Sequence, residues 1–271
     1  IVTEKRVQFR SRPEVEIELK LDAACYAGFA KVQAGEFKRV LSNIVNNAVE
    51  AILSRGTITI SISSSTDQVW ISVSDTGCGI PEHILPKLAQ PGMTFGKPGG
   101  SGLGLYHAKQ SIGRWQGELT IECPAESGTT IKLSLPKVEP PLWFPNELSI
   151  HATTTVIIAD DDPSIHLVWQ GRFRELFKAW ELTIIHCKTF RELEDVVSKL
   201  SSSVAPLFLV DQTISEEGTT GIQTILKLKI ESSSYLVTSK SEDQGLLEKC
   251  LRAKVKVLPK GMAEFIPIVR V

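Results

Sequence analysis

The first half of the chain alternates apolar and polar residues in the way that is typical of β-strands with one buried face. Residues 15–21 (VEIELKL), 57–63 (TITISIS) and 69–75 (VWISVSD) alternate almost strictly, so we expect each of them to form a strand. The polar residues between the last two ranges predict a hairpin. Shorter apolar segments predict further strands at 29–32, 118–122 and 129–135.

Two other ranges in this half carry apolar residues at helical spacing. Between residues 37 and 52 the apolar side chains recur three and four positions apart, and Asn43 and Asn47 lie one turn apart on the remaining polar stripe. A second helix is predicted from 103 to 115. Residues 81–99 contain four prolines and three glycines, which predicts a loop. Strands on one side and helices on the other predict a two-layer α/β sandwich.

The second half alternates short apolar strands with helical stretches. The apolar run at 155–159 ends in three acidic residues, and Pro163 marks the start of a helix. This pattern predicts a doubly wound, five-stranded parallel (βα)5 fold whose site lies at the carboxyl ends of the strands. The further strands are expected at about 182–186, 207–210, 235–238 and 255–258.

The periodicity fails between the two halves, where prolines cluster. We therefore expect one domain at residues 1–137, a linker at 138–152 and a second domain at 153–271. Trp143 and Phe144 are unusually apolar for a free linker, and we expect them to pack on one of the flanking domains.

Composition narrows the classes of partner and the compartment. A net charge of −1 and a pI near 6.6 give no electrostatic reason to expect nucleic acid or a membrane surface as a partner. No run approaches the roughly 18 apolar residues that a membrane span needs. The five cysteines are widely spaced and form no CxxC pair, which favours a reducing compartment. The expected location is the cytoplasm, with the full-length protein anchored in the inner membrane as an open alternative.

Two glycine-rich turns suggest a nucleotide site. The sequence DTGCGI begins at Asp75, and GSGLGL begins at Gly100 and leads into the predicted helix. An aspartate can accept a hydrogen bond from an exocyclic amine, glycines allow the backbone to approach a ligand, and a helix N-terminus favours phosphate. The spacing is GxGxG, not the GxGxxG of dinucleotide-binding folds, and no GxxxxGK[ST] phosphate loop is present.

These segments resemble the motifs of sensor histidine kinases. NIVNNA (residues 43–48) resembles their N box, DTGCGI their G1 box and GSGLGL their G2 box, in the same order. Residues 1–12 resemble the exit from the helical dimerisation domain that precedes the ATP-binding domain in this family. Water-activating ATPases of the wider superfamily carry a glutamate where this chain has Asn43, which cannot act as a general base. The resemblance therefore favours phosphoryl transfer over hydrolysis.

The resemblance also implies roles for individual residues. Asn47 would ligate Mg²⁺ that bridges the phosphates, Asn43 would support the phosphates, and Asp75 would accept from the adenine amine. The phosphates would rest on the backbone of the second turn, with a lid cation beside them and two glycines and an isoleucine near the base. These further ATP contacts are Gly77, Gly79, Ile80, Lys97, Gly100, Gly102, Leu103, Gly104 and Leu105.

Residues 153–271 resemble the receiver domain of two-component systems. Acidic residues end the first and third predicted strands, Thr238 ends the fourth and Lys260 follows the fifth. The resemblance implies that Asp211 is the phosphoacceptor and that Lys260 and Thr238 contact the phosphoryl group. The residues implied to hold Mg²⁺ are Asp160, Asp161, Asp211 and, through its carbonyl, Thr213. The loop after Asp211 departs from the family pattern because it lacks the usual Met-Pro and has an irregular length.

The combined interpretation is the cytoplasmic part of a bacterial hybrid sensor histidine kinase that uses ATP and Mg²⁺. Its expected partners are an upstream dimerisation domain with a phosphoacceptor histidine, and a histidine phosphotransfer protein or response regulator. The full-length protein is expected to be a homodimer. None of the five histidines has the setting of the family's acceptor, so this chain should not phosphorylate itself. The alternative is a nucleotide-binding regulatory module whose receiver domain docks or inhibits without being phosphorylated.

Overall fold

The computed structural model describes residues 2–22, 25–81, 83–85, 88, 103–123, 128–151, 154–177, 182–200, 205–214 and 218–271. The chain divides into two compact units, Ile1–Glu139 and Pro140–Val271, and each is described by itself. Among the described residues, no helix is both long enough and apolar enough to cross a membrane.

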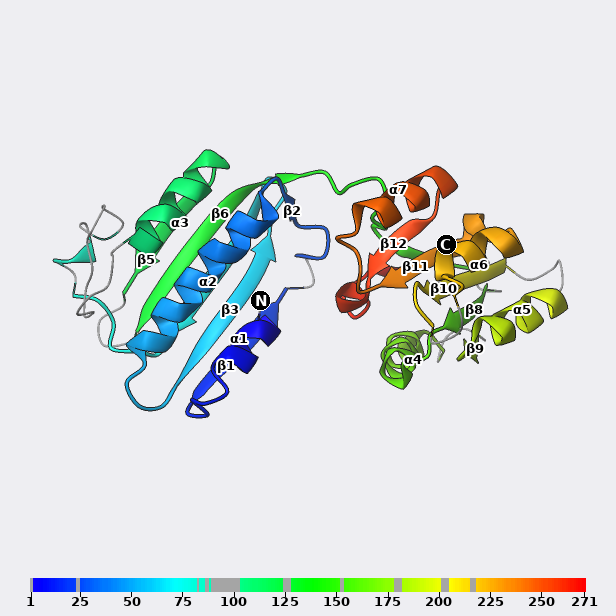
Figure 1. The fold of residues 1–271 in the computed structure, drawn as a ribbon, viewed down its shortest axis with the longest axis horizontal. Helices are drawn as coiled ribbons and strands as arrows, with labels where there is room; N and C mark the ends of the chain where they lie inside the picture. Colours follow the sequence, from blue (N-terminus) through cyan, green and yellow to red (C-terminus); the bar gives the residue numbers. More distant parts are fainter. Residues whose placement is uncertain are drawn as a thin grey trace. The chain divides into compact units, whose positions relative to one another are not determined.

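The first unit is built on a six-stranded sheet (Figure 1). Its β1–β3 pair is parallel, and the other pairs are antiparallel. The strictly alternating segments all form strands, as predicted, because alternation gives each strand one apolar face to bury. In order across the sheet the strands are β1 (Val15–Leu21), β3 (Gly56–Ser64), β4 (Gln68–Asp75), β6 (Thr129–Val138) and β2 (Phe29–Ala30), and β5 (Glu118–Glu122) pairs with β6.

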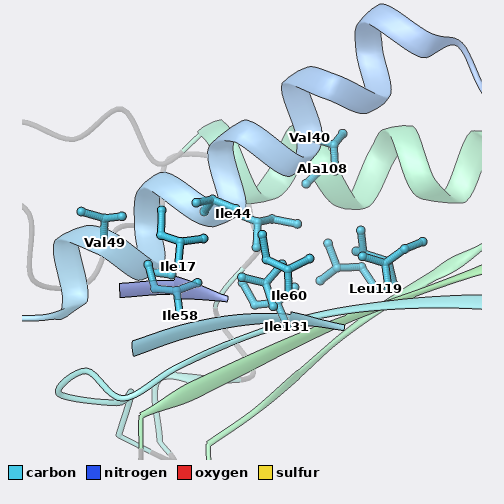
Figure 2. Close-up of a cluster of buried hydrophobic side chains, with 14 of the residues drawn as sticks. Ile17, Val40, Ile44, Val49, Ile58, Ile60, Ala108, Leu119 and Ile131 are labelled. Atoms are coloured by element: carbon cyan, nitrogen blue, oxygen red, sulfur yellow. The ribbon is translucent and has the colours of Figure 1, made fainter. Parts of the chain in front are cut away.

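Helices α2 (Ala34–Ala51) and α3 (Leu103–Arg114) lie across one face of this sheet (Figure 1). Figure 2 shows apolar side chains of α2, such as Ile44, directed towards β3 residues Ile58 and Ile60. All three are at most 4% exposed, and burial of each such side chain contributes about 1.5–3 kcal/mol relative to exposure. The two-layer α/β sandwich predicted for this half of the chain is confirmed.

A short helix, α1 (Val2–Gln8), precedes β1. The Arg6 guanidinium donates to the carbonyl of Ile17 in β1, at 3.0 Å from Nε and 2.7 Å from Nη2. Since β1 is an outer strand of the sheet, this contact satisfies a backbone acceptor that no neighbouring strand reaches on that side.

The second unit contains a parallel sheet of five strands. Of the five strands of this sheet, β8 comes first in the chain and lies between the second and the third, so the strand order reverses direction between β8 and β10. In open α/β sheets this switch point places the carboxyl ends of two strands beside a crevice. In order across the sheet the strands are β12 (Lys256–Pro259), β11 (Ser234–Thr238), β10 (Ala205–Asp211), β8 (Thr154–Ala159) and β9 (Thr183–Cys187).

Both faces of this sheet are covered. Alternate residues of β8, such as Ile157 and Ala159, pack in one cluster with three helices, while Val156 and Ile158 are equally buried on the opposite face. Buried strands of this kind read as continuous apolar runs, as the sequence of β8 does. The helices of the second unit are α4 (Pro163–Phe177), α5 (Phe190–Lys199), α6 (Gly221–Leu228) and α7 (Gln244–Ala253), with a 3₁₀ turn η3 (Glu231–Ser233) before β11.

The fifth helix that a (βα)5 fold predicts is absent from residues 260–271, all of which the structure describes. Strand β12 is followed by one 3₁₀ turn, η4 (Lys260–Met262), and then by β13 (Ile268–Arg270). Pro267 lacks a backbone donor and disfavours helical geometry at the residue before it, while the β-branched residues after it favour a strand. Residues 260–271 therefore do not form the helix that a (βα)5 pattern predicts directly after the last strand.

The segment predicted as a linker belongs largely to the second unit. Residues 148–150 form β7 (Leu148–Ile150), which pairs in parallel with β13. Phe144 is 4% exposed, and the carbonyl of Trp143 accepts from the N–H of Val257 at 2.7 Å. The expectation that Trp143 and Phe144 pack on a flanking domain is confirmed. The sequence shows no strand or helix periodicity in this segment, which predicted a free linker. Strand β7 is only three residues long, and its pairing partner β13 lies at the other end of the unit.

Two leucines in the predicted linker provide a matched test of this packing. Leu148 is fully buried, whereas Leu142 is 81% exposed. We expect Leu148→Ala to lower the free energy of unfolding of the second unit by about 2–5 kcal/mol, because it leaves a cavity. Leu142→Ala should change it by less than about 0.5 kcal/mol. Hydrogen exchange of peptides from β8 and β10 in rising urea measures both. Equal effects would contradict the inclusion of β7 in the core.

Candidate functional site

Two carboxamides lie one turn apart on α2, beside the start of α3. Asn43 and Asn47 are half-buried, and a methyl group added at Gly104 would lie 3.7 Å from the amide of Asn43. The two helices are also joined by a hydrogen bond of 2.7 Å from Ser111 Oγ to Glu36 Oε1. This bond holds the pKa of Glu36 below its usual value. The two helices are thus joined at Ser111 and Glu36, and the first turn of α3 lies beside Asn43.

Asp75 is a buried carboxylate at the carboxyl end of β4. It is 8% exposed, and its Oδ1 accepts from the backbone N–H groups of Gly77 at 2.8 Å and Thr129 at 3.3 Å. Burial raises the pKa of Asp75, and the two backbone hydrogen bonds oppose part of that rise. A carboxylate held in this way presents an oriented acceptor to a ligand.

Two glycines allow the backbone to close around Asp75. A Cβ at Gly77 would lie 2.6 Å from the carbonyl oxygen of Ala51 at the end of α2, and one at Gly128 would lie 1.8 Å from the carbonyl oxygen of Asp75. Gly128 also has φ of +71°, a region that side chains other than glycine rarely adopt. The N–H of Cys78 donates to the carbonyl of Ala51 at 3.0 Å. The loop after β4 is therefore packed directly on the last turn of α2.

The other predicted residues of this site are only partly described. Gly79 has φ of +68°, Ile80 is half-buried, and Leu105 is half-buried in the first turn of α3. Leu103, at the start of the same turn, is 41% exposed. Outside the described residues are Lys97, Gly100 and Gly102.

Sequence reasoning missed Gly128 and Thr129. Thr129 begins β6 and lies opposite Asp75 in the β4–β6 register, which is how its N–H reaches the carboxylate. A GTT run at the start of the last long strand was the available signal. This run indicates a contact with Asp75 only when the pairing of β4 with β6 is known.

A second cluster of polar side chains lies at the carboxyl ends of the parallel strands. Carboxylate oxygens of Asp160, Asp161 and Asp211 lie within 4.8 Å of one another. Lys260 Nζ lies 2.9 Å from Asp160 Oδ2 and 3.1 Å from Asp211 Oδ2. Asp160 and Asp211 are at most 5% exposed, so the ammonium ion partly neutralises two buried acids.

The charges in this cluster strongly influence one another. Burial, and then the charge of Asp160, raise the pKa of Asp211, while Lys260 opposes the rise. Burial alone would lower the pKa of Lys260, but the adjacent Asp160 and Asp211 carboxylates raise it. Asp160 Oδ2 is fully buried, and the partner that the structure gives it is the Lys260 ammonium at 2.9 Å. This oxygen, beside two further carboxylates, fits a small divalent cation with oxygen ligands.

Thr238 and Thr213 border the cluster on neighbouring strand ends. Thr238 ends β11, is 1% exposed, and its Oγ1 accepts from the N–H of Lys240 at 3.0 Å. Thr213 is exposed in the loop after Asp211. A Cβ at Gly221 would lie 2.1 Å from the carbonyl oxygen of Asp211. The irregular loop therefore still returns to bring the first residue of α6 against the backbone of Asp211.

A histidine pair next to this cluster was not predicted. His166 Nε2 lies 2.7 Å from the carbonyl oxygen of Asp160, and its Nδ1 lies 2.8 Å from Nδ1 of His186. Since the carbonyl only accepts, Nε2 of His166 carries the proton of that bond. Burial lowers the pKa of His186. Nothing in the local sequence pairs a residue of α4 with one of β9.

The first unit is similar to a family of ATPases. The family described as "Histidine kinase-, DNA gyrase B-, and HSP90-like ATPase" matches residues 33–139. Sporulation kinase A of Bacillus subtilis (strain 168) is 37% identical over 102 residues, which are 38% of this chain and 17% of that protein. Sensor histidine kinase DpiB of Escherichia coli (strain K12) is 33% identical over 111 residues, 39% of this chain and 20% of that protein.

Another relative is similar along most of the chain. Sensor kinase CckA of Brucella abortus (strain 2308) is 25% identical over an alignment of 274 positions, gaps included, that covers 90% of this chain and 28% of that protein. The chain thus spans less than a third of each of these relatives. The family match covers α2 with its two asparagines, the Asp75 loop and α3. In sequence the first unit is therefore similar to the ATP-binding catalytic domains of sensor histidine kinases.

Proposed function

We propose that the chain is the kinase-catalytic and receiver part of a hybrid sensor histidine kinase. The observation that carries the proposal is that one chain joins an ATP-binding domain of the histidine kinase type to a parallel-sheet unit in which Asp160, Asp211 and Lys260 meet. The similarity to sensor kinase CckA supports it, because that similarity extends over both units.

In the first unit, Asp75 recognises the adenine amine and α2 holds the phosphates. Oδ1 of Asp75 already accepts two backbone N–H groups, so the carboxylate is oriented before the base arrives, and Oδ2 accepts from the amine. Asn47 supplies an amide oxygen to Mg²⁺, which adds a ligand without adding negative charge to the triphosphate. Bound Mg²⁺ neutralises phosphate charge there. Asn43 supports the phosphates from the preceding turn.

The first transfer moves the γ-phosphoryl group of ATP to a histidine outside this chain. A P–N bond forms while the P–O bond to ADP breaks, and ADP retains the electron pair. Asn43 offers no carboxylate to activate water, so the site favours the histidine nucleophile over hydrolysis. This step requires a dimerisation domain that carries the acceptor, and the intact protein acts as a homodimer.

The second transfer moves the phosphoryl group from that histidine to Asp211. A carboxylate oxygen of Asp211 attacks phosphorus, and the histidine nitrogen leaves with the bonding electron pair. Lys260 lies 3.1 Å from Asp211 Oδ2 and is positioned to stabilise the developing charge, while Thr238 donates its hydroxyl to the phosphoryl group. Asp160, Asp161 and the carbonyl of Thr213 would complete a Mg²⁺ site, whose charge offsets repulsion between the acids and the phosphoryl group.

The partners follow from this reaction sequence. A phosphoryl group on Asp211 is passed to a histidine phosphotransfer protein or leads to a response regulator. The reactions use ATP and the five cysteines of the chain are free, and both features fit the cytoplasm.

A regulatory module is the second candidate, and one observation favours it. The loop after Asp211, which lacks the usual Met-Pro and has an irregular length, gives the receiver-like unit an altered surface that is suited to docking or inhibition without phosphorylation. The complete set of acidic residues, threonine and lysine at the strand ends favours phosphorylation.

Asp75→Asn tests the ATP site. The substitution replaces an acceptor pair partly by donors, and we expect ATP affinity to fall by about 1–3 kcal/mol, roughly 5- to 150-fold in Kd. Isothermal titration calorimetry with Mg²⁺ measures the loss. Asp67→Asn, in the exposed hairpin turn, is the control and should bind ATP as the wild type does. Unchanged affinity in Asp75→Asn would remove Asp75 from the site.

The same variant separates binding from folding. The folded-state pKa of Asp75 is raised, so the folded protein holds this proton more tightly than the unfolded chain. Its contribution to stability therefore falls as pH rises from the unfolded value near 4 through the raised folded value. At pH 7 the free energy of unfolding of the first unit should be equal in Asp75→Asn and wild type, or higher in Asp75→Asn. Any such increase should become smaller as the pH is lowered towards 4. Urea denaturation at both pH values checks the sign.

Asp211→Asn tests phosphorylation of the second unit. Beryllofluoride imitates a phosphoryl group on an aspartate, and with Mg²⁺ it should bind wild type and shift the amide spectrum near Thr238 and Lys260. Asp211→Asn should lose the response, whereas Asp195→Asn on the exposed side of α5 should keep it. If wild type and Asp211→Asn behave alike, Asp211 is not the acceptor and the regulatory module becomes the better reading.

A further inference from the structure

The last turn of α2 has one weak cap of its own, because the N–H of Ile52 donates to the carbonyl of Val49 at 3.3 Å. Within α2, which the structure describes throughout, no basic residue lies in the last turn, and the C-cap Ile52 is extended. Many helices end instead in a left-handed glycine that satisfies the final carbonyls. The other carbonyl groups of the last turn, and the partial negative charge of the helix end, therefore need donors from elsewhere in the chain.

Arg12, between α1 and β1, supplies these donors. Its Nη1 donates to the carbonyl of Val49 at 3.1 Å, and its Nη2 donates to the carbonyl of Ile52 at 2.7 Å. Its Nε donates to Glu14 Oε1 at 2.9 Å, and this hydrogen bond holds the pKa of Glu14 below its usual value. The planar guanidinium thus uses all three nitrogens in one fixed arrangement, which a lysine could not reproduce.

The same turn supports the loop that follows Asp75. The carbonyl of Ala51, between the two carbonyls that Arg12 holds, accepts from the N–H of Cys78 at 3.0 Å. Gly77 packs so closely that a Cβ there would lie 2.6 Å from this carbonyl oxygen, and its N–H donates to Asp75. The end of α2 therefore links the Arg12 guanidinium to the loop that orients the Asp75 carboxylate.

We propose that Arg12 is a positioning residue for adenine recognition. It contacts no part of the nucleotide itself; it fixes the last turn of α2 and, through Ala51, the positions of Gly77 and Asp75. The inference rests on the proposed ATP site and adds a specificity-determining residue to it. Displacement of residues 9–14 would loosen the hold on the base and leave the phosphate contacts of Asn43 and Asn47 in place.

The test compares ATP with GTP on the full chain. Competition of each nucleotide, with Mg²⁺, against a fluorescent ATP analogue gives both dissociation constants. Arg12→Gln should bind ATP about tenfold more weakly, which is the effect of losing one charge-assisted hydrogen bond. It should bind GTP with nearly unchanged affinity. The ratio of the two affinities should therefore fall. Destabilisation of the fold alone would reduce both affinities by the same factor.

Two controls fix the interpretation. Arg10→Gln removes an exposed arginine from the same segment and should keep the wild-type ratio. Glu14→Gln removes the carboxylate partner of Arg12 but leaves Arg12 bound to both helix carbonyls. Its ratio of ATP affinity to GTP affinity should therefore stay close to that of the wild type. An unchanged ratio in Arg12→Gln would overturn the positioning role. Failure of the wild type to bind ATP would instead overturn the proposed function.

Arg12→Lys keeps the inference testable if Arg12→Gln does not fold. The lysine retains a positive charge at the helix end but cannot donate to both carbonyls as the guanidinium does. The ratio of ATP affinity to GTP affinity should therefore fall, but by less than in Arg12→Gln. Hydrogen exchange of residues 76–79 should become faster in Arg12→Lys, with exchange in β10 unchanged as an internal control. Wild-type exchange in residues 76–79 together with a wild-type affinity ratio would show that Arg12 does not position the loop.

Discussion

The buried carboxylate of Asp75 is the constraint on which the first unit depends. An ionised acid away from water is stable only where hydrogen-bond donors replace its hydration. Here the donors are the backbone N–H groups of Gly77 and Thr129. They reach the carboxylate because glycines at 77 and 128 let three segments of chain approach without side chains. The ends of α2, β4 and β6 are thus brought together by one acid.

The second unit also buries acidic side chains, but it stabilises them in a different way. Asp160 and Asp211 are buried at adjacent strand ends, but a lysine from a third strand end offsets their charge. The parallel topology makes this possible, because β8, β10 and β12 all present their carboxyl ends at one edge of the sheet. A single ammonium cannot balance three carboxylates, so the cluster keeps an unsatisfied negative charge that favours a cation.

Local patterns in the sequence predicted most of this architecture. Alternation located β1, β3 and β4, and the spacing of apolar residues located α2 with its two asparagines on one stripe. The patterns that failed depend on partners distant in the chain. Strands β7 and β13 are three residues each and are defined by their pairing. Thr129, Arg12 and His166 acquire their roles only from contacts with β4, α2 and Asp160, which no local rule reveals.

The parallel pairing of β7 with β13 gives the second unit a mechanical property. Since β7 lies near the start of the unit and β13 near its end, tension applied through the chain pulls the two strands in opposite directions along their length. Their hydrogen bonds are then loaded together, in shear, and do not open one after another as they would in an antiparallel hairpin pulled from its open end. The bonds at the boundary of the unit thereby shield its core from force transmitted by neighbouring segments.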